Sequence, residues 1–393
     1  ISSNMNDNIT PYVRYIGADD KDLDLFESQY VVPQGISYNS YVITDEKIAV
    51  MDTIDQRKTE EWTVRLEEAL EGRTPDYLIV QHMEPDHAAN IGWFAEKYPE
   101  ATIVASAKAI QMMPQFFEEV NFAGRTQTVK EGDTLCLGQH TLKFIMAPMV
   151  HWPEVMLTYE ESEKILFSAD AFGKFGALCH EGEWIDEARR YYFNIVGKYG
   201  AQVQALLKKA AGLDIAMICP LHGPVLKENL GYYIGLYDTW SKYEPETEGV
   251  VVAYASIHGN TAAAARRMAE ILSEKGAAEV MLIDLCRDDM ALAVESAFRY
   301  SKMIVAASSY DAGVFPPMFD FLHHLQIKNF QKRRVGIIEN GSWAPTAGRM
   351  MSCMLSEMKN MEIMEHMVTI KSSMKKADLL QMEELAEELL ATE

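Results

Sequence analysis

In the second half of the chain, short runs of apolar residues alternate with longer stretches that have helical spacing. The clearest of these stretches, 260–275, is rich in alanine. Short apolar strands that alternate with helices are typical of a parallel sheet whose two faces are both covered. We therefore predict a doubly wound α/β domain. Its expected strands are VVVAYA (250–255), EVMLID (279–284), KMIVAAS (302–308), RVGIIE (334–339) and a run near 362–370.

The first half has a different pattern, in which two groups of strands are each followed by helical stretches. The first group is SQYVVP, YNSYVIT, KIAVMDT and, after a helix near 58–70, YLIVQ (77–81). The second group occupies roughly 125–170, and DIAMICP (214–220) follows a long helical region. Strands and then helices, twice over, predict two mixed sheets packed face to face between outer helices.

A polar segment separates the two halves. YEPETEG (243–249) is acidic, contains a proline and a glycine and has no apolar periodicity, so we interpret it as a linker. The predicted domains are then 1–248 and 249–393. Five parallel strands in a domain of the second one's length fit the flavodoxin-like strand order.

Composition and charge narrow the class of protein. The 393 residues are 48% hydrophobic and 24% charged, as expected for a soluble globular protein of two or three domains. The 36 Lys and Arg against 58 Asp and Glu give a net charge of −22, which leaves no electrostatic attraction to nucleic acid or to an anionic membrane. No apolar run reaches the roughly 18–20 residues that a membrane-spanning helix needs.

The amino terminus and the cysteines indicate the compartment. ISSNMNDNIT is polar, lacks a signal-sequence pattern and does not begin with Met, so we expect a trimmed or tagged end. The cysteines are scattered and form no C-x-x-C pair, which predicts a reduced, cytoplasmic protein and excludes a thiolate cage for a metal. They are Cys136, Cys179, Cys219, Cys286 and Cys353.

The strongest chemical signal is the run QHMEPDH at the end of the apolar strand YLIVQ. It places four potential metal ligands, His82, Glu84, Asp86 and His87, in six consecutive residues. Alternate side chains of an extended chain face one way. We therefore expect His82, Glu84 and Asp86 to point together, and His87 to come from the first turn of the following helix. A lone histidine is most often hydrogen-bonded or solvated, but four such ligands together predict a metal site.

Three further candidates lie at the ends of apolar runs downstream. His151 follows FIMAPMV, Asp170 follows KILFSA, and His222 lies within PLHGP. Each precedes a turn residue or a bulky loop, which is where a sheet presents side chains to a shared cleft. We expect all three to join the first four.

The second candidate site begins after VVVAYA. Small and hydroxylated residues at a strand-to-helix turn offer N–H groups and hydroxyls to a phosphate, although such a loop alone is also compatible with a plain turn. Two more loops follow the third and fourth strands, at the sheet edge where open α/β sheets bind ligands. Tyr310 or Trp343 could stack against a flat ring. The candidates are Ser256, Ile257, His258, Gly259, Asn260 and Thr261; Ser308, Ser309, Tyr310, Asp311 and Gly313; and Asn340, Gly341, Ser342 and Trp343.

Together these motifs resemble a known family. The pattern H-x-E-x-D-H has Glu84 where the metallo-β-lactamase superfamily has its second histidine. Followed by a distant His, Asp and His and then by a flavodoxin-like domain, it is similar to the flavodiiron proteins, or A-type flavoproteins. The similarity extends to SYNSYVI, MDT and FSADAFG and covers essentially the whole chain. It implies an α/β protein with an N-terminal metallo-β-lactamase-like αββα sandwich and a C-terminal flavodoxin-like domain.

The resemblance also implies the ligands of two irons. One iron would take His82, Glu84 and His151, the other Asp86, His87 and His222, with Asp170 bridging them. Three carboxylates and four imidazoles form a harder, more anionic donor set than the His-rich zinc site of a hydrolase, which agrees with iron. His87 is the least secure of the seven, because this histidine is not always bound to its metal within the family.

In the second domain the resemblance implies FMN. The first loop matches the T/S-x-x-G-x-T phosphate loop of flavodoxins, whereas Ser308 and Ser309 stand where many relatives have Pro-Thr. FMN is favoured over a dinucleotide because no G-x-G-x-x-G follows the strand.

The implied activity is reduction of O2 to water and/or of NO to N2O at the non-haem diiron site, fed by FMN. Electrons would come from an external donor such as a rubredoxin, a flavin reductase or reduced deazaflavin. Because the two cofactors belong to different domains, the resemblance implies a head-to-tail homodimer or a dimer of dimers. Two alternatives stay open, namely a zinc-dependent hydrolase fused to a flavodoxin-like domain and a non-catalytic flavin electron carrier.

The remaining histidines have no partner pattern. We expect them at the surface or behind the metal ligands. They are His140, His180, His323, His324 and His366.

Overall fold

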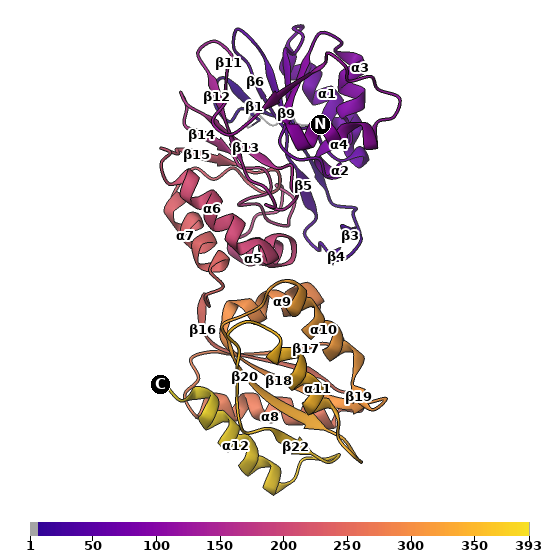
Figure 1. The fold of residues 1–393 in the computed structure, drawn as a ribbon, viewed down its shortest axis with the longest axis vertical. Coiled ribbons are helices and arrows are strands. Elements are labelled where there is room, and N and C mark those ends of the chain that lie inside the picture. The colour runs from indigo at the N-terminus through magenta and orange to yellow at the C-terminus, as the bar shows by residue number, and fades with distance from the viewer. Residues whose placement is uncertain (1–6, 393) are drawn as a thin grey trace. The chain divides into compact units, whose positions relative to one another are not determined.

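The structure is a computed structural model that describes residues 7–392, so the trimmed or tagged end expected at the first residues lies largely outside it. The chain divides into two compact units (Figure 1). The first is Ile1–Tyr192 with Ala201–Tyr237, and the second is Phe193–Gly200 with Asp238–Glu393.

The segment expected to be a linker belongs to the second unit, and part of it is regular structure. Strand β16 (Thr247–Ala255) begins within it, and Tyr243 is buried. The Tyr243 hydroxyl accepts a hydrogen bond from the Gly200 N–H and donates one to the Gly197 carbonyl oxygen, which compensates for its burial. Residue 248 therefore falls inside a strand, and division of the chain at this residue stays a prediction.

The first unit contains two mixed β-sheets. The six-stranded sheet consists, in spatial order, of β1 (Val13–Tyr15), β6 (Tyr41–Ile43), β7 (Ala49–Met51), β8 (Tyr77–Val80), β9 (Thr102–Ser106) and β10 (Thr126–Val129). The five-stranded sheet consists of β11 (Thr134–Cys136), β12 (Thr141–Met146), β13 (Met156–Glu160), β14 (Ile165–Phe167) and β15 (Met217–Cys219). Strands β7 to β10 are parallel, as are β14 and β15, and the other neighbours in these sheets are antiparallel.

The two sheets share one hydrophobic core. Ile79 of the first sheet and Phe144 and Phe167 of the second are fully buried in the same cluster. Beside the first sheet lie α1 (Thr59–Leu70), α3 (Ile91–Lys97) and α4 (Ala107–Phe116), and on the side of the second lie α6 (Gly200–Ala210) and α7 (Leu230–Ser241) (Figure 1). The predicted sandwich of two sheets between outer helices is thus confirmed. Two short pairs, β2 (Ala18–Asp20) with β5 (Ile36–Tyr38) and β3 (Leu25–Phe26) with β4 (Tyr30–Val31), add to it.

His140 lies neither at the surface nor behind the metal ligands, which corrects the sequence-based expectation. Its side chain is 2% exposed and lies between two carboxylates, with Nδ1 2.7 Å from Asp45 Oδ2 and Nε2 2.9 Å from Glu163 Oε2. Asp45 follows β6 of the first sheet, whereas His140 and Glu163 lie in turns of the second. The three side chains form a charged brace that ties the two sheets together.

We expect this brace to make stability depend on pH. Burial opposes protonation of His140, but the hydrogen bonds to Asp45 and Glu163 outweigh it and raise its pKa. A raised folded-state pKa adds stability that is complete below the ordinary histidine value of about 6.5 and disappears as pH rises through the folded value. His140→Gln should therefore lower the melting temperature by a few degrees near pH 6, and the difference should shrink on raising the pH. Thermal unfolding followed by circular dichroism from pH 6 to 9 checks this, and a pH-independent difference would contradict it.

The second unit is built on a parallel sheet. In spatial order its main strands are β17 (Val280–Asp284), β16, β18 (Tyr300–Tyr310) and β20 (Arg334–Asn340), and beyond β20 lie β21 (Glu362–Ile363) and β22 (Val368–Ile370). The last expected strand is split, since β21 and β22 pair separately with the two ends of β20. The register sets Val252 between Leu282 and Ile304. This is the flavodoxin-like order predicted from the sequence.

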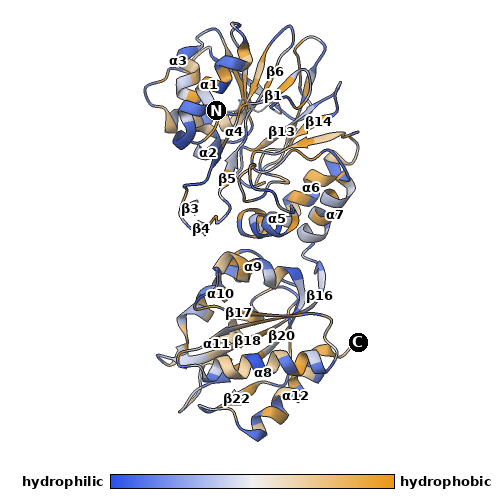
Figure 2. Ribbon diagram, turned by 180° about the vertical axis from the view of Figure 1, so that it is seen from behind, coloured by the Kyte–Doolittle hydropathy of each residue, from blue (hydrophilic) through white to orange (hydrophobic). Residues whose placement is uncertain are grey.

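Helices cover both faces of this sheet. On one face, Met268 and Leu272 of α8 (Asn260–Glu274) and Leu385 of α12 (Lys376–Leu390) are buried in one cluster with the strands. Figure 2 shows the resulting alternation of polar and apolar positions along these helices. Three more helices, α9 (Met290–Arg299), α10 (Pro316–Ile327) and α11 (Ala347–Ser356), pack together. In the described part of the chain, none of the helices has the length and apolar character needed to cross a bilayer.

Candidate metal centre and flavin pocket

The segment after β8 carries four of the predicted metal ligands, but not on one extended stretch. Helix α2 (Pro85–Ala88) begins directly after Glu84, so Asp86 lies in its first turn together with His87. Proline is favoured at the first helical position because its φ is already helical and its missing N–H is not needed there. Pro85 therefore starts the helix earlier than expected, and it is the helical turn that directs Asp86 into the site.

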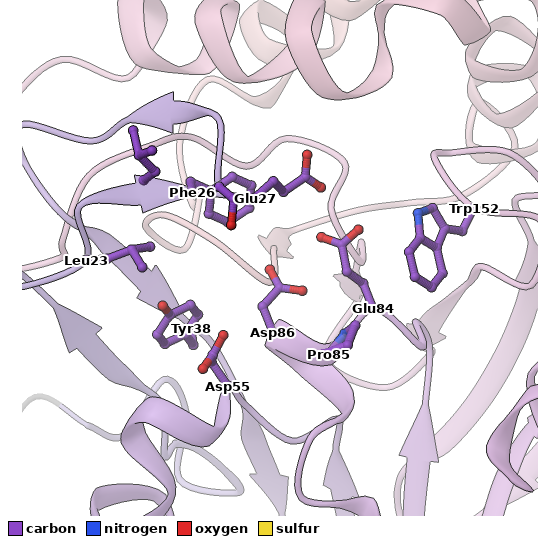
Figure 3. A pocket seen from close by; sticks show the side chains of 11 residues that line it. Leu23, Phe26, Glu27, Tyr38, Asp55, Glu84, Pro85, Asp86 and Trp152 are labelled. Atoms are coloured by element: carbon purple, nitrogen blue, oxygen red, sulfur yellow. The ribbon is translucent and has the colours of Figure 1, made fainter. Parts of the chain in front are cut away.

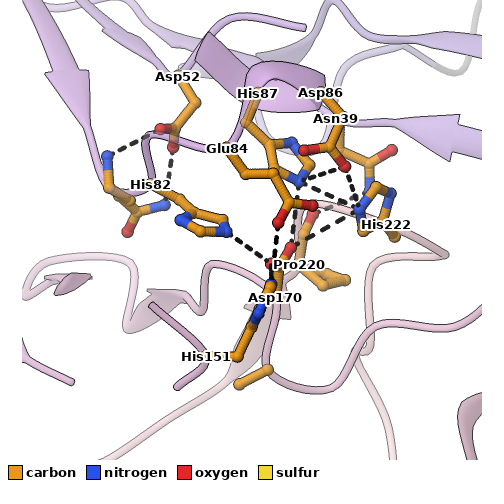
Figure 4. Close-up of polar contacts among 12 residues, drawn as sticks. Asn39, Asp52, His82, Glu84, Asp86, His87, His151, Asp170, Pro220 and His222 are labelled. Carbon is orange, nitrogen blue, oxygen red and sulfur yellow. Dashed lines mark hydrogen bonds and ion pairs between the residues drawn. The ribbon is translucent and has the colours of Figure 1, made fainter. Parts of the chain in front are cut away.

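The structure brings all seven predicted ligands together as two groups of three around one carboxylate (Figure 4). Asp170 Oδ2 lies 3.1 Å from His82 Nε2 and 3.2 Å from His151 Nε2. Asp170 Oδ1 lies 3.1 Å from His87 Nε2 and 3.7 Å from His222 Nε2. Each oxygen of Asp170 thus faces one group. The groups are His82, Glu84 and His151, and Asp86, His87 and His222.

His87 points into this cluster. Its Nε2 is 3.2 Å from Asp86 Oδ2 and 3.1 Å from His222 Nε2. The geometry therefore places the least secure of the predicted ligands with the other six.

The cluster fits a pair of cations. The atoms that face its interior are buried without a hydrogen-bond partner among residues 7–392, and such orphaned groups call for an explanation such as an ion. They include His82 Nε2, Asp86 Oδ1 and Oδ2, His151 Nε2 and Asp170 Oδ1. Each group supplies two imidazoles and one carboxylate, which is the donor set typical of non-haem iron.

The charges in the cluster support the same conclusion. Burial and the neighbouring Asp86 raise the pKa of Glu84. Burial also opposes ionisation of Asp170, yet the surrounding imidazoles, first of all His82, hold its pKa well below the usual range. Three buried carboxylates this close together repel one another, and bound cations would remove that repulsion.

Residues outside the predicted set hold the ligands in place. Glu154 Oε2 accepts hydrogen bonds from His82 Nδ1 at 2.8 Å and from the Met83 N–H at 2.6 Å.

His222 Nδ1 donates to the Ser37 carbonyl oxygen at 2.7 Å. Asn39 Nδ2 donates to the carbonyl oxygens of Pro220 and Gly223 on either side of His222. The sequence signal for Glu154 was its place three residues after His151, and that for Ser37 and Asn39 was the SYNSYVI match.

Asp52 of the MDT motif lies behind the first ligand loop. Its carboxylate accepts hydrogen bonds from the Gln81 N–H at 2.8 Å and from Gln81 Nε2 at 3.0 Å. Burial raises the pKa of Asp52 to about 7. Asp52 therefore fixes the end of β8 from which His82 and Glu84 project.

The cluster opens to a pocket of about 540 Å³ (Figure 3). Glu84, Asp86 and Trp152 line it on one side, and Phe26 and Glu27 of the β3–β4 hairpin line it on the other. Tyr191 is a further buried neighbour that the sequence did not indicate. Its ring lies 5.6 Å from that of His222, and its hydroxyl has no hydrogen-bond partner in the described chain.

The second predicted site is a pocket of about 650 Å³ at the carboxyl ends of β16, β18 and β20. This is within the range of small-molecule and cofactor sites. Of the fifteen predicted contacts, all but Gly259 and Gly313 line it. Gly259 precedes α8 at φ +99°, and Gly313 pairs with Tyr310 in a tight hairpin. The pocket also includes Thr346 and Ser372, which the sequence analysis missed.

Several pocket hydroxyls are already engaged within the protein. Ser308 Oγ and Thr261 Oγ1 are 2.9 Å apart. Ser309 Oγ accepts hydrogen bonds from the N–H groups of Thr346 and Ala347 and so caps α11. The hydroxyls of Ser308 and Ser309 thus join the second loop to the first and to the third.

The aromatic candidates at this pocket remain accessible. Trp343 is 83% exposed and Tyr310 is 46% exposed. A large aromatic side chain buries roughly 150–250 Å² when it is fully covered, so both rings offer contact area to a flat ligand. Both rings line the pocket and are free to stack against a flat ligand.

Comparisons with known proteins show the family of the chain. The family model described as ODP family beta lactamase matches residues 36–223. An anaerobic nitric oxide reductase flavorubredoxin of Aliivibrio salmonicida is 30% identical over 346 residues, which are 84% of this chain and 68% of that protein.

Two solved structures share the fold over nearly the whole length. Rubredoxin oxygen:oxidoreductase from Desulfovibrio gigas superposes with a TM-score of 0.91 at 25% identity, covering 97% of this chain and 96% of that one. The flavodiiron protein from Giardia intestinalis gives 0.88 at 24% identity, covering 98% and 96%. With its paired donor sets around Asp170, the chain belongs to the flavodiiron protein family of oxidoreductases, whose members carry FMN and a non-haem diiron site.

Proposed function

We propose that this protein is a terminal oxidoreductase that reduces O2 to water and/or NO to N2O. The observation that carries the proposal is the placement of Asp170, whose two oxygens face two equivalent sets of two histidines and one carboxylate. The ligands of one iron would be His82, Glu84 and His151, those of the other Asp86, His87 and His222, and Asp170 would bridge them.

The electron count fits both gases. Reducing O2 to two waters takes four electrons and four protons, and coupling two NO to N2O and water takes two of each. When bound, the irons supply open coordination positions and Lewis acidity, and FMN supplies electrons.

The chain itself supplies orientation and a proton donor. Glu154 and Ser37 fix the Nδ1 atoms of His82 and His222, which leaves each Nε2 free to bind a metal. Burial raises the pKa of Tyr191 well above its usual range, so its hydroxyl stays protonated. Its ring lies 5.6 Å from that of His222, so this protonated hydroxyl, unpartnered within the described chain, would be a candidate hydrogen-bond donor near the metal site.

The FMN would occupy the pocket of the second unit. Ser256 and Thr261 line this pocket, and their hydroxyls together with the N–H groups at the start of α8 suit a phosphate. Tyr310 and Trp343 also line it and suit the isoalloxazine ring.

Anaerobic iron and flavin quantitation, followed by O2 and NO uptake with a chemical reductant, tests the proposal. We expect two irons and one FMN per chain and consumption of at least one gas. A protein that holds zinc and hydrolyses a phosphodiester or an ester would instead be the zinc hydrolase. Uptake that survives loss of iron would leave only a flavin electron carrier.

The electron donor and assembly extend the proposal. We expect electrons from an external donor such as a rubredoxin, a flavin reductase or reduced deazaflavin.

Because the FMN pocket and the metal cluster belong to separate units, a head-to-tail homodimer or a dimer of dimers would bring each flavin to its partner's irons. An active monomer in sedimentation would contradict this assembly. The five free cysteines favour a cytoplasmic location, which stays a prediction.

A further inference from the structure

The two halves of the metal cluster have the same donor chemistry. Each consists of one carboxylate and two imidazoles, and Asp170 presents one oxygen to each half. The charge of the ligands therefore does not distinguish the two metal positions. Any difference between them comes from the groups that lie behind the ligands.

A buried anion lies behind the first half. The Glu154 side chain is 0% exposed, and its Oε2 accepts the Nδ1–H of His82 at 2.8 Å. The Met83 N–H donates to the same oxygen at 2.6 Å, and Ser106 Oγ donates to the Glu154 carbonyl oxygen at 2.8 Å, so this residue is held from three directions. A carboxylate behind a metal-binding imidazole makes the imidazole a stronger electron donor.

The second half has no corresponding anion on its imidazoles. His222 Nδ1 donates to the neutral carbonyl oxygen of Ser37 at 2.7 Å. His87 Nδ1 is buried and has no hydrogen-bond partner within the described chain.

Other nearby charges do not cancel this difference. On the first side, Glu27 interacts electrostatically with Glu84 and adds negative charge, whereas burial raises the pKa of Asp52, which is bound to Gln81, to about 7. On the second side, Asp55 interacts with Asp86, and Arg57 pairs with a further carboxylate, its Nε lying 2.7 Å from Asp20 Oδ2. In the described chain neither Asp20 nor Asp55 is hydrogen-bonded to a metal-binding imidazole, as Glu154 is.

We infer that Glu154 makes the metal position formed by His82, Glu84 and His151 the more easily oxidised of the two. The inference rests on the proposed diiron centre. Removal of one electron by an oxidant such as ferricyanide would convert Fe(II) to Fe(III) at this position, because the buried carboxylate stabilises the additional positive charge. Glu154 is then a positioning residue that makes the two metal positions unequal.

Glu154→Gln tests this inference. Glutamine keeps an oxygen acceptor for His82 and Met83 but removes the charge. The difference between the reduction potentials of the two metal positions should become smaller. The comproportionation constant of the one-electron-oxidised state should therefore fall about tenfold, equivalent to about 59 mV. The measurement is a redox titration in which the mixed-valent signal is followed by electron paramagnetic resonance.

Glu160→Gln is the matched control. Glu160 is also fully buried in the first unit, but it lies at the end of β13 that pairs with Leu142, at the opposite end of β12 from His151. It should leave the comproportionation constant unchanged. An unchanged or increased constant in Glu154→Gln would overturn the inference.

A second measurement shows which of the two metal positions is oxidised first, even if Glu154→Gln fails to retain iron. In ⁵⁷Fe Mössbauer spectra of the one-electron-oxidised protein, His151→Asn should alter the ferric component, and His87→Asn the ferrous one. The reverse assignment would overturn the inference. Failure of the proposed function is distinguishable, because unsubstituted protein would then lack iron or gas uptake, whereas failure of this inference leaves both intact.

Discussion

Asp170→Asn is expected to abolish the diiron centre while leaving the flavin in place. Asparagine has the shape of aspartate but is neutral and offers only one acceptor oxygen, so it cannot serve both halves of the cluster. The four histidines that now face the Asp170 carboxylate would instead face an amide group on one side. Loss of an outer-shell partner alone typically costs about 10–100-fold, so loss of this bridge should lower gas uptake at least about 100-fold.

Iron content, FMN content and O2 or NO uptake of the purified variant check this result. FMN should stay at the unsubstituted level, because its pocket belongs to the other unit. Asp214→Asn provides a control, since Asp214 is in the same unit but its side chain is 75% exposed and paired with Lys164 at the surface. An Asp170→Asn protein with two irons and unchanged uptake would remove Asp170 from the site.

Gly259→Val is expected to weaken FMN binding about 10–100-fold and to leave the metal centre intact. Gly259 has φ +99° directly before α8, a conformation that a β-branched residue adopts only with strain of about 1–3 kcal/mol. No atom lies within 4 Å of the added Cβ, so the effect would come from the backbone and not from a clash. Relief of the strain would turn the N–H groups at the start of α8 away from the phosphate.

The other end of the same helix offers a matched control. Gly276 also has φ +99° with no atom within 4 Å of an added Cβ, but it follows α8 and does not line the pocket. Gly276→Val should carry the same strain without loss of FMN affinity. Fluorescence titration of the flavin-free proteins with FMN measures both dissociation constants. Equal weakening in the two variants would assign the effect to general destabilisation.

The elements of the second unit were largely predictable because each has a local pattern. The expected helix 260–275 is found as Asn260–Glu274, and the strands lie where the short apolar runs predicted them. The ordered structure of the segment interpreted as a linker was not predictable. Its polar composition gives no sign that the Tyr243 hydroxyl forms hydrogen bonds with Gly197 and Gly200. The pattern of polar and apolar residues reflects local structure along the chain and not the contacts between distant segments.

For the metal site, the sequence by itself determined which side chains could bind a metal, because His82, Glu84, Asp86 and His87 are close in the chain and the others mark strand ends. The family resemblance implied their division around Asp170, and only the tertiary structure showed the contacts that bring them together and the turn of His87 into the cluster. Only it revealed the carboxylate of Glu154 behind His82 and the brace that buries His140. Glu154 and His82, for example, are 72 residues apart in the chain. Their contact is set by the packing of the sheets, and local periodicity does not encode such contacts.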